Sequence, residues 1–449
     1  MTSIIFLLFV VFEIAFTSYC LFTKSINGKL KSYVRLIAFI IFLILCMLKV
    51  IEWSMRWYLL GVLLLFLAGK GVYVLTSTKI NIKQFRPRKV IRKAIAMIVL
   101  FAFVLIPAFL FPQHKPLQPT GTFQVATAKF TFTSDTITDY FTGGKRQVNV
   151  GFWYPKDIDE KCPLLIFSHG AFGIKNSNFS AFEDLASHGY VVCSIDHPGH
   201  SFYTVSTDGK RTIVDKAYMS EVINSNRKAY YTNAEEYELI KKWMKIRTED
   251  INLTIDSIIR NAKEANTFNN TQVQNDDISK LYRSIDYDKI GIFGHSMGAA
   301  ASVQIGRERN DVSAVINIDG PYFSEMTYDA NLDEFVATRE QYNTPILNIY
   351  SDQVWVQLKD GTDTGVYAGN KISNQICKES YDVYLKGTKH LTLTDLSLSS
   401  PFLASLLNGE ASKVDAKRSI ELEDRIILEF FNATLKGEGD FTAAGVYEQ

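Results

Sequence analysis

The chain has 449 residues, enough for two or three domains. Its formal net charge is only +1, which argues against a nucleic-acid-binding protein, because such a protein needs a basic surface. Hydrophobic residues make up 47% of the chain and gather in long runs in its first quarter, whereas the rest resembles an ordinary globular domain. The five cysteines have no metal-ligand spacing, so we expect unpaired thiols rather than a disulfide framework.

Four apolar stretches in the first quarter are each long enough to cross about 30 Å of hydrocarbon. They cover residues 4–22, 33–51, 57–75 and 90–111. A cleaved signal peptide would account for only the first stretch, which also lacks the basic residues expected ahead of it. Residues 1–112 are therefore predicted to form four transmembrane helices that attach the chain to a lipid bilayer.

Basic residues are unevenly distributed over the loops between these stretches. The first and third loops carry most of them: Lys24, Lys29, Lys31 and Arg35 in the first, and Lys79, Lys83, Arg86, Arg88, Lys89, Arg92 and Lys93 in the third. Short loops rich in lysine and arginine stay on the cytoplasmic side. We therefore expect a multi-pass protein of the cell membrane, with both chain ends and the whole C-terminal domain outside the cytoplasm.

A polar linker with prolines, residues 113–122, is expected to lead into a globular domain over residues 123–449. Strands are predicted at 123–132, 147–153, 163–167, 190–195, 290–293, 314–318, 346–350 and 381–385, and the clearest helices at 180–188, 235–263 and 419–435. The first two strands flank a Thr-Gly-Gly-Lys turn, which indicates a hairpin. Buried strands that alternate with helices indicate a mostly parallel sheet with helices on both faces. The predicted fold class is α/β.

A long polar, helix-rich insertion, residues 201–288, interrupts the alternation of strands and helices. It lies where a cap over an active site would sit. Its composition also suits plain scaffold, so the sequence leaves both roles open.

The strand at 290–293 runs directly into Gly294-His295-Ser296-Met297-Gly298, and three alanines follow. This is a G-x-S-x-G nucleophile elbow between a strand and a helix. Glycines are needed where a Cβ would collide in the sharp turn, which holds the serine in strained geometry. Free N–H groups at the start of the helix favour negative charge on a bound oxyanion. Ser296 is therefore predicted to be a nucleophile, and the alternative is a tight turn in an inactive hydrolase.

A serine nucleophile needs a base that takes its proton and an acid that orients the base. His390 is the only histidine after Ser296, and it follows the last predicted strand, where an α/β-hydrolase carries its histidine. Asp319 and Asp352 both follow strands at the same sheet edge. Spacing alone leaves these two aspartates equal as candidates for the acid.

Two backbone N–H groups should stabilise the negative oxygen that develops during attack on a carbonyl. One is expected from Met297, directly after the nucleophile. The other is expected from Ala171, which follows His169-Gly170 in the loop after the strand at 163–167. This chemistry requires no metal and no cofactor.

The segment from about residue 147 to 436 resembles the platelet-activating-factor acetylhydrolases related to lipoprotein-associated phospholipase. The matching blocks, in chain order, are FSHGAFG, IDHPGHS, KIRTEDI, YDKIGIFGHSMGAA, INIDGPYF, PILNIYSDQ and LKGTKHLTLTDLSL. The resemblance implies that Asp319 is the acid, that Asp352 lies outside the triad, and that Ala171 and Met297 supply the oxyanion donors. The four predicted membrane helices lie outside the resemblance.

Together these features predict a membrane-anchored serine esterase that works through a Ser-His-Asp triad and an acyl-enzyme. The resemblance implies phospholipids with short or oxidised acyl chains, or other small esters, as substrates. Three other functions fit parts of the sequence: an acyltransferase that uses the same acyl-enzyme, a peptidase, and a membrane sensor or transporter with a degenerate hydrolase domain. The intact elbow and the well-placed His390 argue against degeneracy.

Overall fold

The computed structural model of the protein describes residues 1–77, 85–157, 160–267 and 277–448. Contacts between residues divide the chain into two compact units. One unit comprises Met1–Lys115 with Ser399–Leu403, and the other comprises Pro116–Leu398 with Ala404–Gln449. Each unit has its own apolar core.

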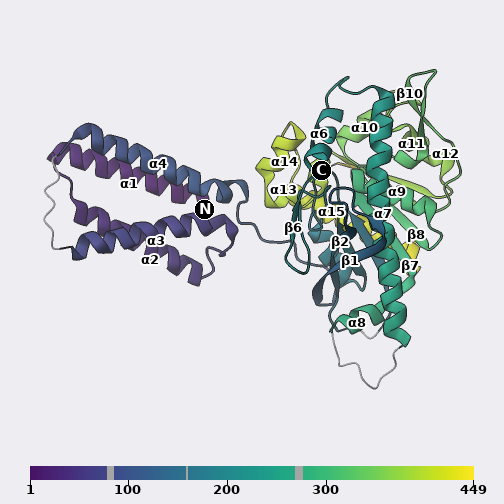
Figure 1. Ribbon diagram of the computed structural model, residues 1–449, viewed down its shortest axis with the longest axis horizontal. Helices are drawn as coiled ribbons and strands as arrows, with labels where there is room; N and C mark the ends of the chain where they lie inside the picture. Colours follow the sequence, from purple (N-terminus) through teal and green to yellow (C-terminus); the bar gives the residue numbers. More distant parts are fainter. Residues whose placement is uncertain (78–84, 158–159, 268–276, 449) are drawn as a thin grey trace. The chain divides into compact units, whose positions relative to one another are not determined.

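Four long helices make up the N-terminal unit (Figure 1): α1 (Thr2–Thr23), α2 (Gly28–Met47), α3 (Met55–Thr76) and α4 (Pro87–Leu110). Their lengths of 20 to 24 residues and their apolar composition are sufficient for each to cross a membrane. α3 packs against α2 and α4, and α4 packs against α1. Trp57, Leu64, Phe101 and Leu105 are buried in the core, whereas Val62, Phe66 and Phe103 are exposed. An exterior of large apolar side chains suits lipid better than water.

The four predicted spans each fall within one of these helices, apart from a few residues at their ends. The prediction placed Lys29, Lys31 and Arg35 in the first loop, but all three belong to α2, because the Asn27 side chain caps that helix by accepting the N–H of Leu30. The basic residues from Arg88 to Lys93, predicted in the third loop, likewise belong to α4. Lys79 and Lys83 lie outside the described residues. Glu13 of α1 is 1% exposed and pairs with Lys31 at 2.6 Å, so its charge inside an apolar helix is compensated.

A nine-stranded sheet forms the centre of the second unit, in the order β1-β2-β4-β3-β7-β8-β11-β12-β13. Its strands are β1 (Val125–Thr138), β2 (Lys145–Pro155), β3 (Cys162–Ser168), β4 (Val191–Asp196), β7 (Ile285–His295), β8 (Val312–Ile318), β11 (Ile346–Tyr350), β12 (Ser380–Lys386) and β13 (Gly445–Glu448). β2 pairs in the antiparallel sense with β1 and β4, and all neighbours from β4 to β13 are parallel.

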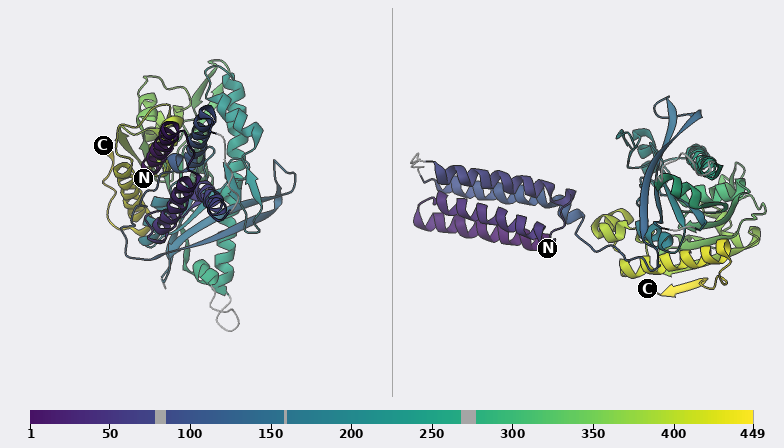
Figure 2. Two further views of the ribbon diagram at one scale, coloured as in Figure 1. Left: turned by 90° about the vertical axis from the view of Figure 1, so that its left-hand side faces the viewer. Right: turned by 90° about the horizontal axis from the view of Figure 1, so that it is seen from below.

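Helices cover both faces of this sheet (Figures 1 and 2). One face packs against α7 (Asn233–Thr267) and α9 (Met297–Glu308), and the other against α5 (Phe179–Ser187) and α15 (Ala416–Phe431). Each face has a continuous apolar core, which explains why the central strands are buried along their whole length. The predicted α/β fold with a mostly parallel sheet is confirmed.

Shorter elements connect the sheet strands. They are the hairpin β5 (Tyr203–Val205) and β6 (Arg211–Ile213), the hairpin β9 (Met326–Asp329) and β10 (Glu334–Ala337), the helices α6 (Lys216–Ser225), α8 (Asp277–Ser284), α10 (Asp352–Leu358), α11 (Ala368–Lys371), α12 (Ser373–Ile376), α13 (Leu396–Ser399) and α14 (Pro401–Asn408), and the single turns η1 (Phe323–Glu325), η2 (His390–Leu393) and η3 (Asn432–Lys436).

The segment predicted as an insertion folds as the β5–β6 hairpin, α6, α7 and α8. Residues 268–276 of that segment lie outside the described residues. The prediction extended it to residue 288, but β7 already begins at Ile285, because Cys162 and Pro163 of β3 pair with Ile285 and Asp286. α7 is amphipathic, and Trp243, Arg247, Ile251 and Ile255 all lie on its buried side.

Candidate active site

Ser296 lies at the turn between β7 and α9, with a φ of 57° and a ψ of −125°. A positive φ is strained for a residue with a side chain. The backbone around the two glycines of the elbow is closely packed: a Cβ added to Gly298 would lie 2.0 Å from the carbonyl oxygen of Ser168, and one added to Gly294 would lie 2.5 Å from the carbonyl carbon of Gly298. Both glycines of the elbow are therefore required by close packing.

Asp319 directly follows β8 and is fully buried. Its Oδ2 accepts a hydrogen bond from Nδ1 of His390 at 2.7 Å and another from Oγ of Ser351 at 2.7 Å. Its Oδ1 accepts the backbone N–H of Ser351, also at 2.7 Å. Together these three hydrogen bonds hold the carboxylate in one orientation. The structure therefore brings Asp319 and His390 together as a pair with fixed geometry.

Asp352, the second aspartate considered from the sequence, is occupied elsewhere. Its Oδ1 accepts the hydroxyl of Tyr384 at 2.8 Å and the backbone N–H of Gly387 at 2.7 Å. Its neighbour Gln353 uses Oε1 to accept the backbone N–H of His390 at 2.9 Å. The start of α10 therefore supports the loop of His390, whereas the imidazole itself is bound by Asp319.

The loop of His390 lies directly beside the elbow. Nε2 of His295, the residue before Ser296, makes a hydrogen bond with the carbonyl oxygen of His390 at 2.9 Å, and the two rings are 4.4 Å apart. On the other side, a Cβ added to Gly170 would lie 3.1 Å from the Cβ of Ser296. The loops after β3, β7, β8 and β12 thus converge at the carboxyl edge of the parallel strands, where open α/β sheets bind ligands.

The two predicted oxyanion donors lie in this same place. Met297 is the first residue of α9, whose N-terminal N–H groups are free of intrahelical partners. Ala171 is half-buried in the loop after β3. The carbonyl oxygens of His169 and Gly170, immediately before it, both accept hydrogen bonds from Arg247 of α7, and the second of these bonds measures 3.1 Å.

A buried polar network behind the site was not predicted from the sequence. Arg146 of β2 binds both carboxylate oxygens of Asp250 at 2.7 and 2.6 Å, and it binds Asp139 at 2.7 Å. His197 connects Asp250 to β3, with Nδ1 3.0 Å from Asp250 Oδ2 and Nε2 2.9 Å from Ser168 Oγ. Burial raises the pKa of Asp250, but the charge of Arg146 and bonds from Arg146 and His197 outweigh it, so that pKa is lowered.

The buried histidines are held neutral. Burial, opposed by the bond to Asp250, lowers the pKa of His197 to about 4, and burial lowers that of His295 to about 3. The ordinary pKa of a histidine side chain is 6.5. An unfolded chain would therefore bind more protons than the folded one between about pH 6.5 and 4. The stability that follows from a neutral His197 is fully present above pH 6.5 and is lost as the pH falls towards 4.

We expect this effect in a comparison of wild type with His197→Asn. Between pH 7.5 and 4.5 the advantage of wild type in free energy of unfolding should shrink by about 2–3 kcal/mol. The quantity to measure is the difference in free energy of unfolding between the two proteins. Burial raises the pKa of Asp395 to about 6, so Asp395 makes both proteins more stable as the pH falls, and this contribution cancels in the difference. Urea unfolding of the full chain in detergent, followed by tryptophan fluorescence, gives this difference, and an advantage independent of pH would contradict the prediction.

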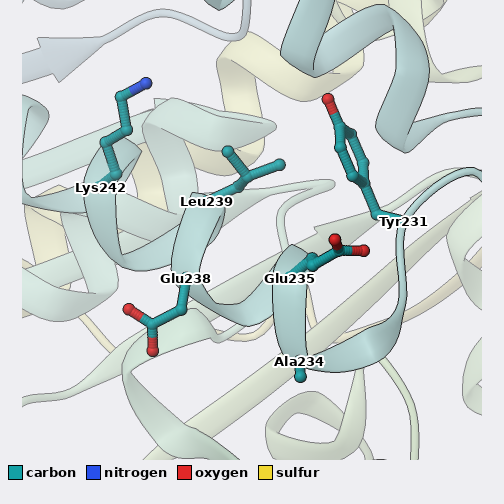
Figure 3. Close-up of a pocket in the computed structure, with 6 residues that line it drawn as sticks. All are labelled: Tyr231, Ala234, Glu235, Glu238, Leu239 and Lys242. Carbon is teal, nitrogen blue, oxygen red and sulfur yellow. The ribbon is translucent and has the colours of Figure 1, made fainter.

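An open pocket of about 560 Å³ lies away from these residues, at the start of α7 (Figure 3). It is lined by Tyr231, Ala234, Glu235, Glu238, Leu239 and Lys242. Its carboxylates are already bonded, Glu235 to Thr232 and Glu238 to Lys241. None of the predicted site residues lines this pocket, so the convergence of loops around Ser296 is the better candidate for an active site.

Comparisons with known proteins agree with this architecture. A family model described as platelet-activating factor acetylhydrolase, isoform II, matches residues 126–445. The platelet-activating factor acetylhydrolase of Bos taurus is 24% identical over 289 residues, which cover 63% of this chain and 59% of the bovine protein. The protein of the same name from Cavia porcellus is 25% identical over 290 residues, covering 64% of this chain and 61% of that protein. The chain thus spans about three fifths of the length of these relatives.

A ferulic acid esterase from Streptomyces cinnamoneus has a similar structure, with a TM-score of 0.52. The likeness covers 71% of this chain and 92% of the esterase at 17% sequence identity, so it shows a shared fold. The family match extends over well more than half of the chain and includes all the blocks that carried the resemblance. The chain therefore belongs to the platelet-activating factor acetylhydrolase, isoform II family.

Proposed function

We propose that this protein is a membrane-anchored serine hydrolase of carboxylic esters, with Ser296, His390 and Asp319 as its triad. The observation that carries this proposal is the hydrogen bond from His390 to the fully buried Asp319, beside a serine held at positive φ. The family membership and the names of the relatives, which are acetylhydrolases, support the same chemistry.

The hydrogen bond to Asp319 assigns roles to the two ring nitrogens of His390. Nδ1–H donates to the carboxylate, so Nε2 is the nitrogen that takes the proton of Ser296 as its Oγ attacks the ester carbonyl. The N–H groups of Met297 and Ala171 stabilise the oxyanion. His390 then returns the proton to the leaving alcohol, and an acyl-enzyme remains. Water, deprotonated by the same Nε2, releases the acid and restores Ser296.

The proposed substrates are phospholipids or small esters with short or oxidised acyl groups. The test is hydrolysis of acetyl, butyryl and octanoyl nitrophenyl esters by the full chain in detergent, with fluorophosphonate labelling in parallel. Turnover that falls from acetyl to octanoyl supports a short acyl pocket, and a folded protein that neither labels nor turns over would refute the function. An added alcohol acceptor distinguishes hydrolysis from acyl transfer by the product formed.

The proposed anchor is the bundle of α1 to α4, with the hydrolase unit outside the cytoplasm. Basic residues gather around the start of α2, with Lys24 just before it, and around the start of α4, and such residues stay on the cytoplasmic side. Protease added to intact cells should therefore remove a C-terminal epitope, while an epitope placed between α1 and α2 should survive until the cells are permeabilised. The reverse pattern would place the hydrolase unit inside the cell.

A further inference from the structure

The side chain of Arg247, in the KIRTEDI block, forms hydrogen bonds with the loop after β3. It lies on the buried side of α7 and has 0% of its surface exposed. Among the described residues, no carboxylate lies within ion-pair distance of its guanidinium, although Arg146 nearby has two such partners. Its Nη1 donates to the carbonyl oxygen of His169, and its Nη2 donates to that of Gly170 at 3.1 Å. A desolvated cation placed on two main-chain oxygens is unfavourable without a compensating role.

The geometry of the peptide bond connects these contacts to the predicted oxyanion donor. The carbonyl of Gly170 and the N–H of Ala171 belong to one planar trans peptide, so they point in opposite directions. The Gly170 oxygen is held by Arg247, by Nδ1 of His169 at 2.7 Å and by the N–H of Gly173 at 3.2 Å. Fixing this oxygen on the side of α7 turns the Ala171 N–H away from α7.

Tyr218 connects Arg247 to Met297, the residue of the other predicted donor. The hydroxyl of Tyr218 lies beside the guanidinium, and this interaction lowers the pKa of Tyr218 against the larger effect of burial, which raises it. The same hydroxyl donates to Sδ of Met297 at 3.2 Å. Arg247 therefore contacts the peptide that carries the Ala171 N–H directly, and reaches the side chain of Met297 through one intermediate.

We propose that Arg247 is a positioning residue for the oxyanion hole, fixing the peptide between Gly170 and Ala171 so that its N–H points at the reacting carbonyl. This inference rests on the proposed ester hydrolysis. The fork of the guanidinium is required, because it binds two successive carbonyl oxygens at once. Its charge also polarises the Gly170 peptide, which makes the Ala171 N–H a stronger donor. The effect appears when the oxyanion forms, so it changes kcat more than KM.

The experiment compares Arg247→Met and Arg247→Lys with wild type, as full chains in detergent. The endpoint of fluorophosphonate labelling counts folded sites, and kcat is expressed per labelled site. For Arg247→Met we expect kcat to fall by about 10²-fold, the effect of losing one oxyanion donor, with KM nearly unchanged. Affinity for a trifluoromethyl ketone, whose adduct carries an oxyanion, should fall by a similar factor. Lysine, which can bind one of the two oxygens well, should recover part of both losses.

Arg309→Met is the matched control. It removes a guanidinium that pairs with Asp311 and Asp256 at the far end of α9, and it should leave kcat per labelled site unchanged. A purely structural role for Arg247 would lower the labelled fraction and leave kcat per site and ketone affinity as in wild type, and this would overturn the inference. If Arg247→Met does not fold, Arg247→Lys decides by the same criteria. A wild type that neither labels nor hydrolyses esters would instead refute the proposed function.

Discussion

Replacing Ser296 by alanine is expected to lower kcat for nitrophenyl acetate by about 10⁶-fold, the loss found when the nucleophile of a serine hydrolase is removed. The variant retains the oxyanion donors and the binding surface, so a small residual rate above water is expected. Alanine at this position keeps the same backbone and loses only an oxygen. The folded structure should therefore be retained, and the positive φ of 57° remains as the main local strain.

Esterase kinetics and fluorophosphonate labelling of purified full-length protein in detergent measure this loss. Ser313→Ala is the matched control, since Ser313 is exposed on the neighbouring strand β8. Its activity and labelling should equal those of wild type. Appreciable labelling of Ser296→Ala at another residue, or turnover within tenfold of wild type, would show that Ser296 is not the nucleophile.

Replacing Asp319 by asparagine is expected to lower kcat by about 10⁴-fold, as in serine hydrolases in which the buried acid of the triad loses its charge. An amide presents an NH₂ as readily as an oxygen to His390 Nδ1, and the ring then takes the tautomer whose Nε2 already carries a proton. Such an imidazole cannot accept the proton of Ser296. KM should change little, because no contact with the substrate is removed.

Asp352→Asn is the control that separates the two aspartates. It weakens bonds to Tyr384 and Gly387, so it should reduce the labelled fraction while kcat per labelled site stays within about tenfold of wild type, as for a change that leaves the triad intact. If Asp352→Asn had the larger effect on kcat per labelled site, and Asp319→Asn left that kcat nearly unchanged, Asp352 would be the acid.

Most of the sheet could be predicted because its strands are long apolar runs bounded by turns. β3, β4, β8, β11 and β12 all lie within two residues of their predicted positions. The β9–β10 hairpin and β13 were missed because they are only four residues long and partly exposed. Strands of this kind are stabilised by their neighbours, and they carry no hydrophobic pattern of their own.

The parts of the candidate site that depend on local sequence and on the order of residues along the chain could be predicted. The elbow at Ser296 and the position of His390 follow from local pattern, whereas Asp319 and Asp352 both end strands at one sheet edge, so only the folded geometry distinguishes them. The contacts of Arg146 and His197 with Asp250 span 104 and 53 residues. Pairings over such distances leave no periodic signal in one sequence, although charged residues in the IDHPGHS and KIRTEDI blocks were unusual for segments beside buried strands.

The strand β13 forms the solvent-exposed edge of the sheet beside β12. It pairs in parallel with β12 from Val383 to Lys386, and it occupies the outermost position on that side. β13 has only four residues, whereas β12 has seven, so without β13 the outermost strand would present a longer row of unpaired N–H and C=O groups, and copies of a protein aggregate along long exposed edges of this kind. Lys386 and Glu448 form an ion pair across this last junction at 2.6 Å. Removing the last few residues before an expression tag would therefore replace a short edge strand by a longer one and favour aggregation, even though every group around Ser296 stayed in place.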